Sequence, residues 1–110
     1  MFDLKGKKMT VTVILDCACN DGKAEDLVAV GKSDGGFAVT RTHKGFQTIY
    51  CSIDQADPNR VLIIEQWDSK EDYDTYLGWR MDNGFGELMA PILAEEIKFT
   101  FLDDQMERIE

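Results

Sequence analysis

The sequence predicts a single α+β domain whose strands and helices follow the order strand, helix, strand, strand, helix, strand. Stretches rich in β-branched and aromatic residues recur at strand length along the chain. Between them lie amphipathic stretches whose apolar residues repeat with the period of a helix. A chain of 110 residues has the usual size of one domain. We therefore expect residues 1–110 to fold as one unit, with the core at 9–102 and an acidic tail at 103–110.

The first half of the chain predicts a strand, a helix and a short second helical piece. Residues 9–16 alternate threonine with valine and then become apolar throughout, which is typical of a strand with a buried face. The Asn-Asp-Gly sequence at 20–22 supplies a turn before the first helix. The glycine pair at 35–36 interrupts this helix, and residues 37–42 resume it until Gly45. The buried face of the first helix is predicted from Ala24, Leu27, Val28 and Gly31.

The second half predicts a hairpin, a helix and a last strand. Residues 46–53 and 61–67 are the hairpin strands, because Asp, Pro and Asn at 57–59 form a turn between them. Ser69 is placed to cap the second helix, whose inward face is predicted from Tyr73, Tyr76, Leu77 and Arg80. Glycines at 84 and 86 interrupt that helix, and residues 97–102 form the last strand. Before this strand comes a shorter helical segment with Leu88, Met89, Ile92 and Leu93.

This order of elements is the split βαβ, or ferredoxin-like, sandwich with a four-stranded antiparallel sheet. Helices cover one face of such a sheet, and in an isolated domain the other face is usually polar. Here residues 14–15, 62–64 and 99–102 put apolar side chains on both faces. The sequence therefore predicts a homodimer in which two sheets pack face to face as a dimeric α/β barrel. The alternative is an open face that tolerates water through Thr12, Thr48, Gln66 and Thr100.

Composition argues against several kinds of partner. The net charge of −9 repels phosphate groups and no cluster of Lys and Arg offsets it, so neither nucleic acid nor a membrane is expected as a partner. No stretch has the length and apolarity of a bilayer span. The N-terminal residues lack the apolar run of a secretory signal, and three cysteines suggest free thiols, which predicts a cytoplasmic location. Cys17, Cys19 and the sole histidine, His43, do not complete a metal-ligand set, so no metal is expected.

Four segments of the chain carry a recognisable combination of residues. They are Thr40-Arg41 with Gly45-Phe46, the turn Asp57-Pro58-Asn59, the strand end Glu65-Gln66-Trp67-Asp68-Ser69, and the helix segment from Tyr73 to Arg80. Together they resemble the antibiotic biosynthesis monooxygenase (ABM) family of dimeric α/β barrels, over about residues 9–102. The best-known members of that family are cofactor-independent monooxygenases that oxidise anthrone-like polyketides. Relatives on the same scaffold degrade haem or isomerise small phosphorylated sugars, so the fold does not fix the chemistry.

The sequence can test whether this chain resembles the haem-degrading relatives. By resemblance, those relatives have an Asn on the first strand, a Trp on the third and a His on the helices that follow. Trp67 matches the tryptophan, but residues 9–16 contain no Asn and no histidine follows His43. Haem is therefore not expected.

The pocket of this fold lies between the sheet and its helices. Two side chains there are candidates for a catalytic base: His43, because imidazole titrates near neutral pH, and Glu65, because burial on a strand favours its protonated form. The lining is predicted to suit a small, flat, hydrophobic or aromatic ligand. It consists of Trp67, Tyr73, Tyr76, Trp79, Phe85 and Met89.

Each candidate also has a structural interpretation. Trp67 and the tyrosines could simply pack the core, and Trp79 and Arg80 could fix the turn between helical pieces, with Arg80 paired to an acidic side chain. His43 could be an exposed loop residue, and Glu65 could form a structural salt bridge.

These residues and the resemblance together predict a monooxygenase that requires no flavin, haem or metal. A phenolic or enolisable substrate binds against Trp67 and the tyrosines, and His43 or Glu65 removes a proton. The resulting anion then reduces O2 while the pocket excludes water. Two alternatives stay open. One is a non-catalytic small-molecule-binding or stress-associated dimer with the same pocket, and the other is an isomerase of small carbonyl compounds with a more polar pocket.

Overall fold

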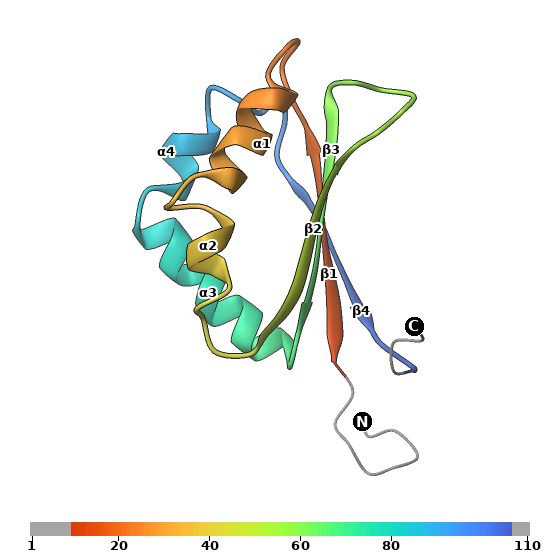
Figure 1. Ribbon diagram of the computed structural model, residues 1–110, viewed down its shortest axis with the longest axis vertical. Helices are drawn as coiled ribbons and strands as arrows, with labels where there is room; N and C mark the ends of the chain where they lie inside the picture. The colour runs from red at the N-terminus through yellow and green to blue at the C-terminus, as the bar shows by residue number, and fades with distance from the viewer. Residues whose placement is uncertain (1–9, 107–110) are drawn as a thin grey trace.

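The computed structural model describes residues 10–106. One antiparallel sheet has the strand order β2-β3-β1-β4, in which β1 is Val11–Ala18, β2 is Phe46–Ile53, β3 is Arg60–Trp67 and β4 is Lys98–Asp103. The helices α1 (Ala24–Lys32), α2 (Phe37–Thr40), α3 (Lys70–Asp82) and α4 (Phe85–Met89) all lie on one side of this sheet (Figure 1). The predicted α+β, ferredoxin-like split βαβ fold is confirmed.

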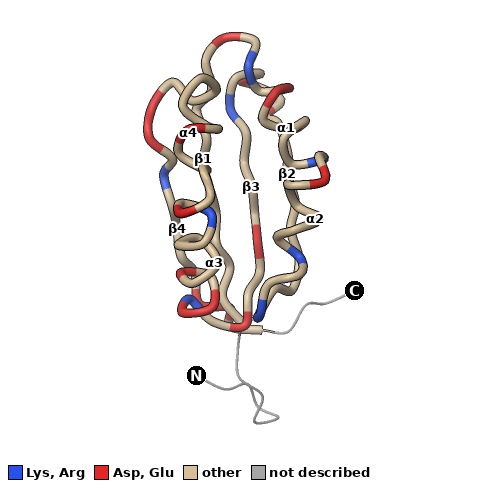
Figure 2. Tube along the Cα trace, turned by 90° about the vertical axis from the view of Figure 1, so that its left-hand side faces the viewer, with Lys and Arg blue, Asp and Glu red and all other residues tan. Residues whose placement is uncertain are grey.

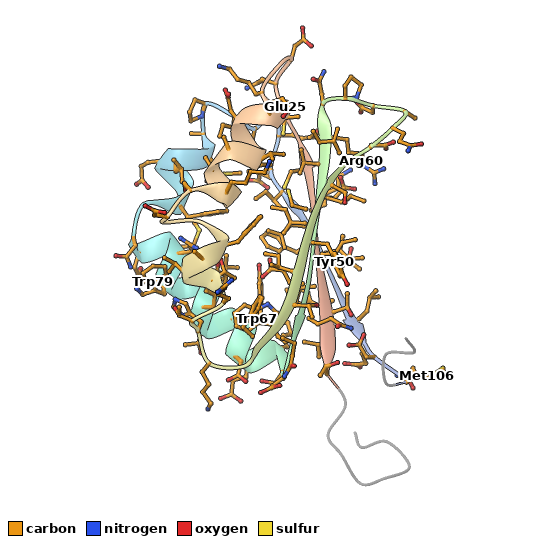
Figure 3. All side chains as sticks on the ribbon, viewed as in Figure 1. Glu25, Tyr50, Arg60, Trp67, Trp79 and Met106 are labelled. Atoms are coloured by element: carbon orange, nitrogen blue, oxygen red, sulfur yellow. The ribbon has the colours of Figure 1, made fainter. Side chains whose placement is uncertain are left out.

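The side of the sheet beneath the helices, here called the covered face, forms the core. Along β1 and β3 every second residue is buried, because successive side chains of a strand point to opposite faces. Figure 3 shows Trp67 pointing from the sheet toward the helices, with Tyr50 on the opposite side. The buried residues that β1 and β3 place on the covered face are Val13, Leu15, Cys17, Val61, Ile63, Glu65 and Trp67.

Strand β2 contains a β-bulge that the sequence did not predict. Phe46 pairs with Trp67, and the next pair is Thr48 with Gln66, so Gln47 is the extra residue. A bulge shifts the alternation of the residues beyond it. As a result, four residues of β2 pack against the core even though the first two are three positions apart: Phe46, Ile49, Cys51 and Ile53.

The start of α3 follows its predicted signal, whereas α2 and α4 end earlier than predicted. Ser69 caps α3, because its Oγ accepts a hydrogen bond from the backbone N–H of Asp72 at 3.1 Å. The helix α2 is shorter than the predicted segment 37–42 and ends at Thr40. Likewise α4 ends at Met89, so Ile92 and Leu93 lie beyond it. Of the predicted first strand, residue 9 lies outside the described residues, as do residues 107–110 of the acidic tail.

The other side of the sheet, here called the open face, has no helix over it (Figure 1). At its centre one cross-strand row runs through all four strands and consists of Tyr50, Ile64, Ile14 and Thr100. At one end of the face Arg60 donates hydrogen bonds to the carboxylates of Asp16 and Asp54. At the other end Asp104 accepts hydrogen bonds from the hydroxyls of Thr10 and Thr12. The open face therefore has an apolar centre between two polar ends.

Within residues 10–106, no helix combines the length and apolarity that crossing a membrane requires.

The glycine pair at 35–36 provides a matched test of the tight turn between α1 and α2. A Cβ at Gly36 would lie 2.2 Å from the backbone oxygen of Val30, whereas a Cβ at Gly35 would meet nothing within 4 Å. We expect Gly36→Ala to lower the free energy of unfolding by about 1–3 kcal/mol through this clash. Gly35→Ala should stay within about 1 kcal/mol of the wild type. Urea denaturation measures both, and equal effects of the two substitutions would contradict the predicted close approach at Gly36.

Candidate active site

A cavity of about 170 Å³ lies between the covered face and the helices. Strands β1 and β3 form its floor, and all four helices contribute to its walls. Most of its lining is aliphatic or aromatic, as is usual for a small-molecule site. The polar residues of the lining are Ser33, Thr40, Glu65, Tyr73, Tyr76 and Arg80.

Glu65 is the acidic residue of this lining. It lies between Ile63 and Trp67 on the covered face of β3, where only 3% of its surface is exposed. Figure 2 shows an acidic segment along β3, with a basic segment at the upper end of the same strand. Its Oε1 accepts a hydrogen bond from Nε1 of Trp67 at 3.0 Å. Oε2 receives no hydrogen bond from a described residue. Every fully buried side-chain oxygen of the described residues has a hydrogen-bond partner, so Oε2 is not fully buried. Because Glu65 lines the cavity, we conclude that Oε2 is accessible from it.

The environment of Glu65 changes the pKa of its carboxyl group. Burial raises that pKa from 4.5 to about 7, even though the hydrogen bond from Trp67 and the charge of Arg80 act in the opposite direction. No ion pair forms between Glu65 and a cationic side chain of the described region that would offset the effect of burial. The carboxyl group therefore exchanges a proton near neutral pH, as a general base in this range must do.

Arg80 joins α3 to the segment before α2. Its Nε donates a hydrogen bond to the hydroxyl of Tyr76 at 2.7 Å, and its terminal nitrogens donate to the carbonyl oxygens of Gly35 and Gly36, each at 2.8 Å. Thr40 completes the cluster, because its Oγ1 accepts from Arg80 at 3.0 Å and lies 2.7 Å from the Tyr76 hydroxyl. The predicted acidic partner of Arg80 is therefore wrong. The acceptors are carbonyl and hydroxyl oxygens.

The structure separates the two candidate bases. His43 does not line the cavity. Its ring packs against Tyr76 and Trp79, with centroid distances of 4.9 and 4.8 Å. Figure 3 shows Trp79 on the outer side of α3, and 39% of its surface is exposed. Trp67 is completely buried beside the cavity and stacks on Tyr76 at 5.1 Å.

Five of the eight predicted site residues line the cavity: Glu65, Tyr73, Tyr76, Phe85 and Met89. The prediction missed Thr40, which is buried and polar. A threonine in a four-residue helix carries no sequence signal of its own. The four-residue spacing from Tyr76 to Arg80 indicated that these side chains meet on α3. The backbone oxygens of residues 35 and 36 that accept hydrogen bonds from Arg80 could not be predicted, because every residue has such an oxygen.

The cysteines do not form a reactive centre. Burial raises the pKa of Cys17 to about 12 and also raises the pKa of Cys19 and Cys51, so their reactive thiolate forms are scarce at neutral pH. In the described part of the chain, no three Cys, His, Asp or Glu side chains converge as metal ligands.

The raised pKa of Glu65 has a measurable effect on stability. Between pH 4.5 and about 7 the folded state holds a proton that the unfolded state has released, so this residue makes the protein less stable as the pH rises. Glu65→Gln keeps an acceptor for Trp67 but does not titrate. As the pH rises from 4.5 to about 7, the wild type should lose about 3 kcal/mol of unfolding free energy relative to the variant. Urea denaturation at several pH values measures the difference, and a difference independent of pH would contradict the raised pKa.

Comparison with solved structures shows that the fold is shared with proteins of distant sequence. A conserved protein from Methanosarcina mazei has 13% identity and a TM-score of 0.76, covering 89% of this chain and 95% of that one. A protein from Pseudomonas aeruginosa has 19% identity and a TM-score of 0.73, covering 89% and 96%. A monooxygenase of Streptomyces coelicolor, solved in complex with nanaomycin D, has 18% identity and a TM-score of 0.74, covering 94% of each chain. A comparison with curated proteins finds no match.

The family comparison extends from the first strand to the second half of α3. The sequence profile described as "Antibiotic biosynthesis monooxygenase" matches residues 11–79, more than half of the 110 residues. The matched region contains Glu65 and Tyr76 of the cavity lining, together with Trp67, which stacks on Tyr76 behind the lining. The chain belongs to the antibiotic biosynthesis monooxygenase family.

Proposed function

We propose that this protein is a cofactor-independent monooxygenase that oxidises a small enolisable or phenolic substrate with O2, with Glu65 as the base. The observation that carries the proposal is a carboxyl group with a pKa of about 7 and one oxygen accessible from an apolar cavity. Membership of the family supports the class of reaction. His43 lies outside the cavity, which favours Glu65 of the two candidate bases.

The proposed reaction converts an activated CH2 group into a carbonyl group. Oε2 of Glu65 accepts a proton from the CH2 carbon, and the carbanion transfers one electron to O2. The radical pair then combines to form a C–O bond, and Glu65 returns the proton to give a hydroperoxide. Loss of the second C–H proton breaks the O–O bond, and that proton and the departing hydroxide form water. One oxygen atom thus enters the product, the other enters water, and the substrate supplies all the electrons.

The cavity has the properties that the first step needs. Its apolar lining limits the access of water to the anion, so the electron goes to O2 while protonation from solvent is slowed. Near neutral pH a substantial fraction of Glu65 is ionised and able to accept a proton. The hydrogen bond from Trp67 holds Oε1 and leaves Oε2 for the substrate. Trp67 therefore acts as a positioning residue.

The proposed active form is a homodimer. The row Tyr50, Ile64, Ile14 and Thr100 crosses the open face, and Tyr50 is 55% exposed. Packing two open faces against each other would bury this apolar centre and complete a dimeric α/β barrel. The ion pairs of Arg60 with Asp16 and Asp54 offset part of the negative charge at that polar end of the face.

Oxygen consumption tests the reaction and the base. With a panel of cyclic diketones, hydroquinones and anthrones, we expect the wild type to consume oxygen with at least one substrate, and the rate to rise with pH through a midpoint near 7. Glu65→Gln should reduce the rate by at least about 100-fold. Trp67→Phe should move the midpoint to higher pH, because the indole hydrogen bond lowers the pKa of Glu65.

His43→Ala is the matched control for the second candidate base and should stay within about threefold of the wild type, since a residue outside the cavity does not take part in proton transfer. Full activity in Glu65→Gln would remove Glu65 as the base. Ligand binding without oxygen uptake for every substrate would instead favour the non-catalytic binding protein.

Sedimentation at micromolar protein tests the assembly. The wild type should sediment as a dimer, and Ile64→Lys should sediment as a monomer, because a charge at the centre of the open face cannot be buried without a partner. Met81→Lys, a change at a residue of α3 that is 55% exposed, should leave the dimer intact. Circular dichroism checks that both variants fold. A wild type of monomer size would overturn the proposed dimer.

A further inference from the structure

We propose that the cavity selects ligands with a single ring and that Arg80 sets this limit by holding residues 35–36 in place at one side of the opening. The inference rests on the proposed function in one respect, that a ligand enters this cavity, and it adds the size class of that ligand. It concerns binding alone, so it is tested without any oxygen chemistry.

The volume of the cavity gives the size limit. The cavity measures about 170 Å³, and an apolar protein cavity of about 150 Å³ is known to hold one benzene molecule. One ring with one or two small substituents therefore fills the space. A fused three-ring skeleton has more than twice as many ring carbons as benzene. It does not fit unless the walls move or part of the ligand stays outside.

The exposed residues of the lining mark the opening. They are Ser33 and Gly35, which lie between α1 and α2, and Leu88, which is 49% exposed on α4. Arg80 belongs to the lining and donates hydrogen bonds to the carbonyl oxygens of Gly35 and Gly36. One guanidinium group therefore ties one side of the opening to α3.

The wall behind this segment has little room to yield. A Cβ at Gly31 would lie 2.4 Å from the ring of Phe37, so the ring rests directly on the backbone of α1. Gly36 approaches the carbonyl oxygen of Val30 just as closely. Close-packed contacts of this kind resist expansion. Release of the segment by loss of the Arg80 hydrogen bonds is the direct way to widen the opening.

The polar groups of the cavity define the rest of the ligand. Arg80, Thr40 and Tyr76 already bind one another and the backbone, so they offer few hydrogen-bonding sites to a ligand. Oε2 of Glu65 is accessible from the cavity floor, as the contacts of that carboxyl group indicate. A ligand that matches this arrangement has one ring and one acidic or hydrogen-bond-donating group, as a phenol or a cyclic 1,3-diketone has.

A series of hydroxyarenes tests the size limit. Dissociation constants are measured for phenol and 2-naphthol by NMR titration and for 2-hydroxyanthracene by its own fluorescence. In a pocket without a size limit, affinity rises with each ring, because more apolar surface is buried. Here we expect affinity to fall at least tenfold from phenol to 2-hydroxyanthracene.

Two variants test the role of Arg80. Arg80→Lys keeps the charge near Glu65 but lacks the planar fork that reaches both carbonyl groups. It should raise the affinity for 2-hydroxyanthracene relative to phenol at least tenfold. Leu88→Ala, on the opposite side of the opening, should shift this ratio of affinities in the same direction. Because Leu88 is exposed, this variant should fold even if Arg80→Lys does not. Arg41→Lys, at an exposed arginine that follows α2, is the matched control and should leave the ratio within twofold of the wild type.

The results separate this proposal from the proposed function. A wild-type affinity that rises with every ring, or no binding of phenol at all, would overturn the size limit. A ratio unchanged in both Arg80→Lys and Leu88→Ala would overturn the assigned role of the opening. The expected ratios together with no oxygen uptake for any substrate would support the size limit and count against the monooxygenase.

Discussion

The alternation of side chains along β3 is the constraint on which the site depends. Because Val61, Ile63 and Trp67 must face the helices, Glu65 must face them too. A carboxyl group in that position loses hydration and gains only the indole N–H of Trp67 in return. Its raised pKa follows from this placement. A single acidic residue on the covered face of β3 thus gives an apolar cavity, among the described residues, a group that ionises near neutral pH.

The two faces of the sheet have different tasks. The covered face carries the core and the cavity, and the bulge at Gln47 lets β2 supply both Phe46 and Ile49 to that core. The open face has an apolar centre that no element of the described chain covers. Both faces belong to the same four strands, so a partner packed on the open face would contact the strands that position Glu65. Association of this kind would couple to the geometry of the cavity floor through β3.

Sequence reasoning predicted most of the fold, because strand length, turn residues and the Ser69 cap are local signals. It predicted that Glu65 is buried for the same reason. The bulge at Gln47 was missed because one extra residue in a strand does not disturb a pattern that is already mixed. The prediction of an acidic partner for Arg80 was wrong, because its hydrogen bonds go to main-chain oxygens that a sequence pattern does not reveal. The separation of His43 from the cavity depends on how α2 and α3 pack, which a linear pattern does not encode.

The choice of acceptors by Arg80 has a consequence for how this protein can evolve. Every residue type has a carbonyl oxygen, so the hydrogen bonds to positions 35 and 36 make no demand on the side chains there. Gly36 is fixed by its close approach to Val30, but Gly35 and the exposed Asp34 are free of that restriction. Substitutions at these two positions can change the shape and charge around the entrance while the loop keeps its place. Homologous proteins could therefore differ in ligand preference at positions 34 and 35 while they keep the hydrogen bonds from Arg80 to the backbone.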